Sequence, residues 1–396
     1  MKAALGQGLL SMQGKEWQQH RKIMDTGFKF SKQVKFLPIF QKKMKSLFAN
    51  MDKCTTMDNS YDILVYCREF TINNTTETLG GRDLEKSTTI DVKHYSQQIA
   101  RIMEYVSAIS YKVFYQNKHI LKWAHSTIFK EQRKTIEFLH KELVETFEYY
   151  AQGDGCDPHY VKNVECVAES VLEAIKRGDI SHELATTGLI HLFGGAFETT
   201  SSTLYFTILM LGIYPEYQAK VYEEVCEIFP DNDDGEFEVT YEHITQFKYL
   251  DMFIKETMRL FPTIPHFGRL IVGGDLTLSN GTVLPEGLEI TVNTYNLHRN
   301  KDVWGRAANT FDPDNFLPSK TAERHPYAFI PFSKGIRSCI GMRYAEMNLK
   351  VAISKIVKRY KFYCPAKIDD FVLYNHISTQ LASYPPLTVE RRTFCK

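Results

Sequence analysis

The longest apolar stretch of the chain, from about Thr187 to Tyr214, places the strongest constraint on how the chain can fold. A run of this length is either a membrane span or a helix that the rest of the protein surrounds. It contains His191, Glu198 and five consecutive hydroxyl side chains at 199–203, which lipid would solvate poorly. We therefore predict a long helix buried in a protein core.

The remainder of the chain shows two patterns of side chains. Up to Pro262, apolar and charged residues alternate at helical spacing in several segments, whereas Leu270 to Asn293 alternates at strand spacing between turn signals. Asn280-Gly281 is typical of a two-residue hairpin turn, and a last helix is expected from about Ile340 to Tyr360. We predict a mainly α fold with small β-sheets late in the sequence.

The composition excludes some classes of protein. With 396 residues, of which 43% are hydrophobic, the chain can bury a large core. Its formal net charge of +1 gives no reason to expect nucleic acid as a partner. None of the eight cysteines has the C-x-x-C spacing of a zinc or redox site.

One cysteine stands in a loop with a distinctive set of neighbours. In the segment Phe332 to Gly341, Cys339 lies just before the last expected helix, and Gly335 and Gly341 allow the backbone to turn tightly. A thiolate that binds haem iron needs such a loop, with backbone N–H groups and a helix N-terminus to stabilise its charge. Arg337 is suited to pair with a haem carboxylate. A buried structural cysteine is the alternative, but these neighbours favour the ligand.

These neighbours match the signature F-x-x-G-x-R-x-C-x-G at every fixed position, with Phe332, Gly335, Arg337, Cys339 and Gly341. The chain therefore resembles the cytochrome P450 family. The resemblance implies the cytochrome P450 fold, haem b as the cofactor and Cys339 as the ligand of its iron. It also implies a single catalytic domain over residues 1–396.

A second match is Lys255 to Pro262, which is similar to the E-x-x-R helix of the family. Glu256 and Arg259 are three residues apart, so they lie on one helix face and can pair. Most such pairs are solvated surface pairs, but the resemblance implies a buried structural one. The family commonly places an arginine where this chain has Asn315, so the arrangement is expected to be weakened or rebuilt, with His325 as a candidate partner.

Within the long apolar helix, Gly194 to Thr200 resembles the oxygen-binding segment of the family's central helix. The resemblance assigns Thr199 to hold oxygen or water and Glu198 to supply protons. A core helix with glycines for packing is the alternative, but it leaves the carboxylate of Glu198 unexplained. Gly195 stands where many family 4 enzymes carry a glutamate that bonds to the haem, so covalent attachment is not expected.

A fourth match is Trp17 to Arg21, which resembles the W-x-x-x-R motif of the family. The two residues are four apart and lie on one helix face. The resemblance implies that the pair contacts a haem propionate, with Arg269 as a third propionate partner. Such pairs also recur by chance, and this one gains weight from its place upstream of the other motifs.

The detail of Arg324 to Phe332 looks most like the microsomal family 4 clan, especially its insect members. Compared with that clan, we expect the chain to be truncated at its N-terminus, without the membrane anchor, the first helices and part of a sheet. The strands between Leu270 and Thr291 would then have unpaired edges.

The resemblance implies a monooxygenase that inserts one atom of dioxygen into an apolar substrate, such as a fatty acid, steroid, terpenoid or xenobiotic. Electrons would come from NADPH through NADPH–cytochrome P450 reductase, with cytochrome b5 as a second candidate donor, at the cytosolic face of the endoplasmic reticulum membrane. Candidate residues of the apolar pocket are Phe193, Ala196, Phe197 and residues 264–267 and 379–382.

Two other functions stay open on the sequence. A haem-thiolate isomerase or dehydratase would act on a peroxide-like substrate in place of dioxygen, and it would not need proton delivery by Glu198 and Thr199. The other is an inactive or haem-poor truncated product.

Overall fold

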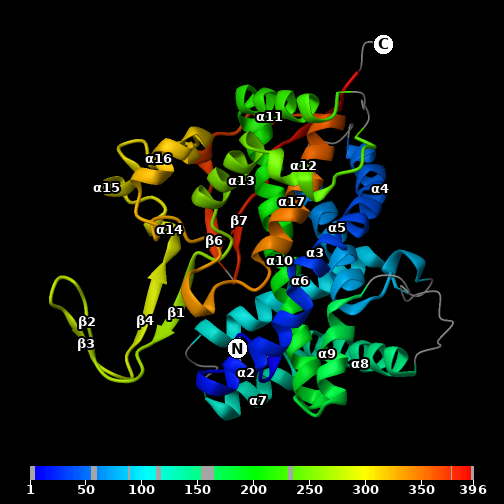
Figure 1. Ribbon diagram of the computed structural model, residues 1–396, viewed down its shortest axis with the longest axis vertical. Helices are drawn as coiled ribbons and strands as arrows, with labels where there is room; N and C mark the ends of the chain where they lie inside the picture. The colour runs from blue at the N-terminus through cyan, green and yellow to red at the C-terminus, as the bar shows by residue number, and fades with distance from the viewer. Residues whose placement is uncertain are drawn as a thin grey trace.

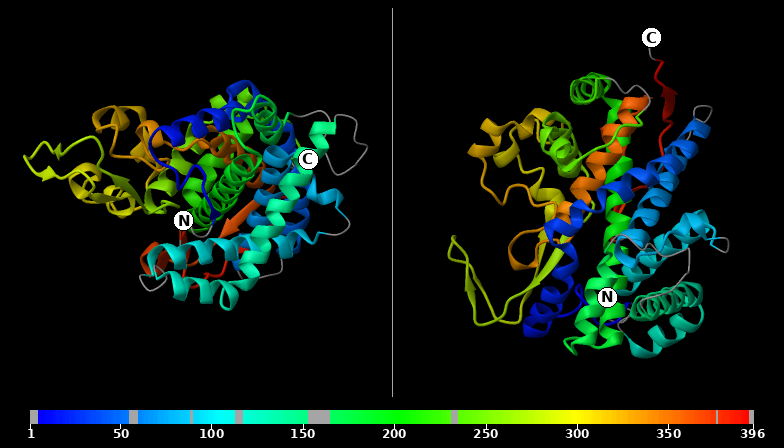
Figure 2. Two further views of the ribbon diagram at one scale, coloured as in Figure 1. Left: turned by 90° about the horizontal axis from the view of Figure 1, so that it is seen from below. Right: turned by 45° about the vertical axis from the view of Figure 1, so that its right-hand side comes forward.

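In the computed structural model, the helices gather around one long central helix, and small antiparallel sheets lie at the periphery (Figure 1). The structure describes residues 5–54, 60–87, 90–112, 117–152, 165–230, 235–375 and 377–393. The central helix α10 runs through the middle of the molecule with α17 beside it (Figure 2). The predicted mainly α fold with small late sheets is confirmed.

The elements have the following bounds. The helices are α2 (Gly14–Asp25), α3 (Phe30–Val34), α4 (Leu37–Cys54), α5 (Ser60–Gly80), α6 (Val92–Tyr111), α7 (Lys118–Ser126), α8 (Lys130–Gln152), α9 (Val167–Lys176), α10 (His182–Ile213), α11 (Pro215–Ile228), α12 (Tyr241–Gln246), α13 (Tyr249–Leu260), α14 (Thr294–Leu297), α15 (Lys301–Trp304), α16 (Pro318–Glu323) and α17 (Met342–Arg359). The strands are β1 (His266–Leu270), β2 (Leu276–Thr277), β3 (Val283–Leu284), β4 (Glu289–Asn293), β5 (Tyr360–Tyr363), β6 (Leu373–Asn375), β7 (Thr379–Leu381) and β8 (Thr388–Arg391).

Helix α10 is buried over most of its 32 residues. Its polar side chains find partners inside the protein: the hydroxyls of Thr186, Thr203 and Thr207 each donate to the backbone carbonyl four residues earlier. His191 accepts a hydrogen bond from the backbone N–H of Leu10 (3.3 Å). The predicted buried core helix is therefore confirmed, and no helix in the described ranges is long and apolar enough to cross a membrane.

The sheets formed by the described residues each have two antiparallel strands. Strand β1 pairs with β4, and β2 pairs with β3 in an arm that projects from the body (Figure 1). The predicted two-residue turn at Asn280-Gly281 is wrong, because the backbone N–H of Leu278 donates to the carbonyl of Thr282 (2.8 Å) and leaves three residues in the loop. Gly281 ends that loop at φ +82°, which is a common way to close a longer hairpin.

The first turn of α17 is fixed to the neighbouring helices. Tyr344 is buried, its hydroxyl is 3.0 Å from that of Thr78 on α5, and its ring meets that of Phe40 on α4 edge to face at 5.1 Å. Helix α17 begins three residues after Cys339, close to the predicted start. The loop that carries Cys339 therefore leads into a firmly held helix.

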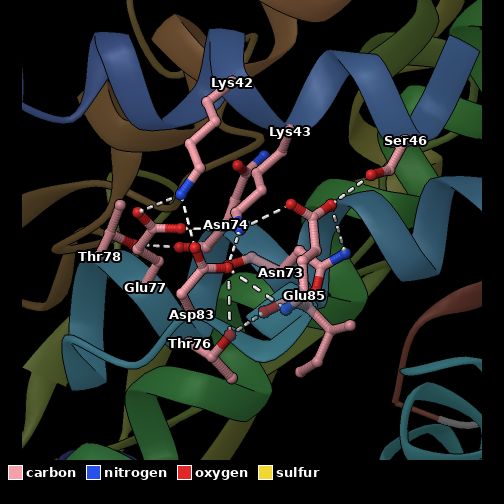
Figure 3. Close-up of polar contacts among 11 residues, drawn as sticks. Lys42, Lys43, Ser46, Asn73, Asn74, Thr76, Glu77, Thr78, Asp83 and Glu85 are labelled. Carbon is pink, nitrogen blue, oxygen red and sulfur yellow. Dashed lines mark hydrogen bonds and ion pairs between the residues drawn. The ribbon is translucent and has the colours of Figure 1, made fainter. Parts of the chain in front are cut away.

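A group of buried charges joins α4 to α5 and to the turn that follows it (Figure 3). Lys43 is fully buried, and its Nζ contacts the carboxylates of Glu77 (2.8 Å), Asp83 and Glu85 (3.0 Å). Burial alone would lower the pKa of Lys43, but the three carboxylates outweigh it and raise the pKa. Burial alone would raise the pKa of Asp83, but hydrogen bonds from Lys42 and Lys43 lower it.

We predict that Lys43→Met destabilises the protein by about 3 kcal/mol, because it leaves buried carboxylates with one cation fewer. The matched control is Lys45→Met on the exposed side of the same helix, which should change the free energy of unfolding by less than about 0.5 kcal/mol. Denaturant unfolding of both variants measures the difference. If Lys43→Met and Lys45→Met had the same free energy of unfolding, Lys43 would contribute nothing to stability.

The pKa directions also fix how pH acts on this cluster. The stabilisation by Asp83 is present above its ordinary pKa and is lost as pH falls through the lowered folded value. The stabilisation by Lys43 is present below its ordinary pKa and is lost as pH rises through the raised folded value. The difference between the wild type and Lys43→Met should therefore stay constant around neutral pH and shrink at both extremes.

Candidate functional site

The segment from Phe332 to Gly341 forms a tight loop at the start of α17. The backbone N–H of Cys339 donates to the carbonyl oxygen of Phe332 (2.9 Å) and closes the loop. Gly335 lies at φ +77°, which favours glycine, and Ser333 adopts φ +60° despite its side chain. A non-glycine residue in this region costs about 1–3 kcal/mol, and such strain is found where a functional site holds the backbone.

Cys339 presents its thiol to open space from inside the protein. The residue has exposed surface, yet desolvation by the surrounding protein raises the pKa of its thiol. Both observations hold if the sulfur lies at the bottom of a recess. The backbone N–H of Gly341 and the guanidinium of Arg21 act to lower the pKa, but burial outweighs them. The sulfur therefore needs a bound cation to be ionised at neutral pH.

Arginines from two distant elements contact this loop. Arg21 on α2 donates from Nη1 to the carbonyl oxygen of Ser338 (2.8 Å). Arg269 on β1 donates from Nη2 to the hydroxyl of Ser333 (2.7 Å). Figure 1 shows the loop before α17 between β1 and α2. Segments more than 200 residues apart in sequence are thus joined around the cysteine.

The third arginine, Arg337, belongs to the loop itself. It donates to two backbone carbonyls of the N-terminal segment (3.3 and 2.6 Å), and its guanidinium lies 4.0 Å from the centroid of the buried Trp17 ring. Burial lowers the pKa of Arg337, and the charges of Arg269 and Arg21 lower it further. Among the described residues, Arg21 has a carboxylate partner, Asp25 (2.8 Å), whereas no ion pair compensates Arg269 or Arg337. Positive charge at the loop is therefore only partly compensated.

Helix α10 turns a face of small residues towards open space. Gly194, Gly195, Ala196 and Thr199 keep accessible surface within an otherwise buried stretch, and a Cβ added at Gly195 would meet nothing within 4 Å. The hydroxyl of Thr199 donates to the carbonyl oxygen of Gly195 (2.5 Å). By contrast, Phe193 is buried so close to α5 that a Cβ on Gly80 would come within 3.2 Å of its ring.

The carboxylate of Glu198, which follows Phe197 on α10, has polar partners from other parts of the chain. This carboxylate is buried and accepts hydrogen bonds from Ser378 (2.8 Å) and Gln380 (3.0 Å), and Arg68 on α5 lies 3.5 Å away. Gln380 falls within the stretch predicted to line the pocket. Sequence reasoning missed Ser378 and Arg68, which no motif marks.

A cavity of about 440 Å³ lies between α6, α8 and the two small sheets that carry His266 and Asn375. Apolar and polar side chains share its lining, which includes Ala108 and Phe129 together with Glu104. His266 belongs to the predicted pocket residues 264–267.

Comparison with known proteins agrees with this geometry. The family model described as Cytochrome P450 matches residues 1–380. The chain belongs to the cytochrome P450 family. It is 32% identical over 391 residues to "Probable cytochrome P450 313a4" of Drosophila melanogaster, covering 98% of this chain and 78% of that protein. It is 29% identical over 395 residues to "Cytochrome P450 4c3" of the same organism, covering 94% of this chain and 71% of that protein.

The fold is also that of a solved cytochrome P450. The crystal structure of a cytochrome P450 (CYP102L1) superposes with a TM-score of 0.80 at 17% identity, covering 99% of this chain and 82% of that one. The predicted resemblance to the P450 family, including its family 4 members, is confirmed.

The cofactor of this P450 is haem b, held through a cysteine thiolate as in the family. The loop fits that group in two ways. An accessible but desolvated thiol suits a bond to a metal cation, and three clustered guanidiniums suit the two propionates of the porphyrin. Cys339 would bind the iron, while Trp17, Arg21, Arg269 and Arg337 would hold the propionate side.

The pair Glu256–Arg259 on α13 is fully buried. Arg259 makes two parallel bonds to Glu256 (both 2.7 Å). Its remaining N–H groups donate to the backbone carbonyls of His298 (2.9 Å), Ala308 (2.5 Å) and Thr310 (2.9 Å). All five donors of the guanidinium are therefore used, and they fix the irregular segment that leads to the cysteine loop.

Asn315 takes the place where the family commonly has an arginine. Its Nδ2 donates to the Oε1 of Glu256 (3.1 Å). The suggested rebuilding with His325 is wrong, because that residue is exposed and its Nδ1 accepts from the backbone N–H of Tyr327. Because Asn315 carries no charge, the second positive charge near Glu256 comes from Arg324, which interacts electrostatically with it. The guanidinium of Arg324 lies 4.3 Å from the centroid of the Trp304 ring.

We predict that Arg259→Lys destabilises the protein by about 3–5 kcal/mol and lowers its haem content in parallel. An ammonium keeps the charge but has three donors, so at least two buried acceptors lose their partners. Lys255→Ala is the control, since it breaks only a partly exposed pair with Asp251, worth up to about 1 kcal/mol. Thermal unfolding and the haem-to-protein ratio are measured together. Full haem content and normal stability in Arg259→Lys would contradict the structural role.

Proposed function

We propose that this P450 inserts one atom of dioxygen into an apolar substrate, with electrons from NADPH. The observation that supports the proposal most directly is the accessible, desolvated thiol of Cys339 among three arginines. Haem-thiolate iron, when bound there, supplies the activation of dioxygen and the cleavage of its O–O bond. The chain's own residues bind the haem, orient the substrate and deliver protons.

Each site residue has a role in this proposal. Phe332, Gly335 and Gly341 shape the loop that presents Cys339. On α10, Thr199 holds water at its hydroxyl, because its hydrogen is already directed to the carbonyl oxygen of Gly195 and its lone pairs can accept a hydrogen bond from water. Glu198, the preceding residue, supplies protons.

The substrate is proposed to enter through the cavity between α6, α8 and the small sheets. Fatty acids, steroids, terpenoids and xenobiotics all have the apolar body that such a cavity would bury. Glu104, Lys112 and His266 add polar groups to its lining, which suit a substrate with one polar end.

The electron donor is proposed to be NADPH–cytochrome P450 reductase, with cytochrome b5 as a second donor. A position at the cytosolic face of the endoplasmic reticulum membrane is proposed from the likeness of residues 324–332 to the microsomal family 4 clan.

We predict that Thr199→Ala lowers the yield of product per NADPH by roughly tenfold or more, because proton delivery loses its hydroxyl. Purified enzyme and reductase are given isotopically labelled dioxygen with lauric acid, testosterone or geraniol as probes. Labelled product, NADPH consumed and peroxide released are measured together. In the wild type, one labelled atom should enter the product.

Thr200→Ala is the matched control, since it removes a hydroxyl from the next position on α10, where the side chain is buried. Its coupling should stay close to that of the wild type. Product that forms without NADPH and without label would favour an isomerase or dehydratase. Unchanged coupling in Thr199→Ala would remove that residue from the proposed mechanism.

A further inference from the structure

The two oxygens of the Glu198 carboxylate have unequal surroundings. Oε1 accepts from the hydroxyl of Ser378 (2.8 Å) and from Nε2 of Gln380 (3.0 Å), and it is the atom nearest to Arg68 (3.5 Å). Oε2 is buried and has no hydrogen-bond partner within the described residues. One oxygen is therefore saturated and the other is bare.

This inequality is unusual for a buried carboxylate. An ionised carboxylate has about four acceptor positions, and leaving an oxygen buried without a donor is unfavourable. Glu256 in the same protein shows the satisfied alternative, because both its oxygens are paired. The bare Oε2 of Glu198 is the one place on this side chain where a proton can reside without displacing an existing donor.

We infer that Ser378 and Gln380 are positioning residues for Glu198, which hold Oε1 so that Oε2 alone carries and releases the proton. The inference rests on the proposed monooxygenase function. A proton leaves Oε2, passes through water at the Thr199 hydroxyl and is consumed by the reduction of dioxygen with electrons from NADPH. The charge left on Glu198 is stabilised by its two donors and by Arg68, and solvent returns a proton to Oε2.

The hairpin of β6 and β7 holds these donors independently of Glu198. The backbone N–H of Thr379 donates to the carbonyl of Thr263 (2.9 Å), and its hydroxyl donates to that of Pro262 (2.8 Å). Thr263 in turn bonds to Thr203 on α10 (2.9 Å). The hairpin should therefore keep its place when a donor to Glu198 is removed.

The same hairpin reaches both the solvent and the substrate cavity. Tyr374, which is 37% exposed, donates its hydroxyl to Oε1 of Gln380 (3.0 Å), so the donors of Glu198 connect to the surface. Asn375 lines the cavity and is the register partner of Thr379. The hairpin that holds Glu198 would therefore contact a substrate bound in this cavity.

The test uses the full chain with haem and compares Ser378→Ala and Gln380→Leu with two references. Ser201→Ala is the matched control, because its hydroxyl bonds to the backbone carbonyl of Glu198 (3.1 Å) and not to the carboxylate. Ser378→Thr keeps a hydroxyl and should restore the wild-type result. One readout is the C–O stretching band of the carbon monoxide complex, which responds to the electric field at the site and needs no substrate.

The second readout is the share of consumed NADPH that appears as peroxide, with lauric acid as the probe. Losing one hydrogen bond to Oε1 should make the observed conformation of the Glu198 carboxylate roughly tenfold less populated. Ser378→Ala and Gln380→Leu should therefore shift or split the C–O band and raise the peroxide share, whereas Ser201→Ala and Ser378→Thr should match the wild type. In a Glu198→Gln background, Ser378→Ala should cause no further change in the C–O band or the peroxide share, since both substitutions act through the carboxylate of Glu198.

Three outcomes would overturn the inference. A C–O band unchanged in both donor variants would show that they do not position Glu198. Full additivity of Ser378→Ala with Glu198→Gln would assign Ser378 a merely structural role. A wild-type chain that binds no haem, or forms no carbon monoxide complex, would overturn the proposed function itself and the inference with it.

Discussion

A thiol that is to bind a metal ion from inside a protein must stay reachable, and groups around it must favour the thiolate once the cation is bound. Cys339 meets both conditions, because the residue has exposed surface and the backbone N–H of Gly341 and the guanidinium of Arg21 act to lower the pKa of its thiol. Desolvation raises the pKa of the thiol, so ionisation depends on the cation it binds. The loop is closed by its own backbone bond to Phe332 and continues into α17, whose first turn Tyr344 fixes to α4 and α5. The backbone that carries the sulfur is thus fixed on both sides of Cys339.

The buried charges of this protein fall into two kinds that differ in how completely they are paired. Arg259 uses all five of its donors and, with Glu256, fixes the segment that leads to the cysteine loop. In the cluster between α4 and α5, Lys43 contacts three carboxylates. Within the described residues, Oε2 of Glu198 has no hydrogen-bond partner, and of the three arginines at the cysteine loop Arg21 alone has an ion-pair partner, Asp25. Arg259 and Lys43 are thus paired more completely than Glu198 and these arginines, where a proton or a ligand is expected.

Much of this arrangement could be predicted from the sequence, because it depends on local patterns. The apolar run with internal hydroxyls indicated a buried helix, and the spacing of Glu256 and Arg259 indicated a shared face. The partners of Glu198 could not be predicted, since Arg68 and Ser378 lie 130 and 180 residues away in sequence. The contact of the Phe193 ring with Gly80 on α5 could not be predicted either, because helical spacing alone does not say which face of a helix meets which neighbour.

The central claim is that Cys339 binds haem iron as a thiolate, and the absorption spectrum of the reduced, carbon monoxide-bound protein tests it most directly. The purified chain should show the long-wavelength band of thiolate-bound haem, and Cys226→Ala, which removes another partly accessible thiol, should show it too. Cys339→Ala should lose that band while the helical content stays near that of the wild type. A thiolate spectrum retained in Cys339→Ala would contradict the account.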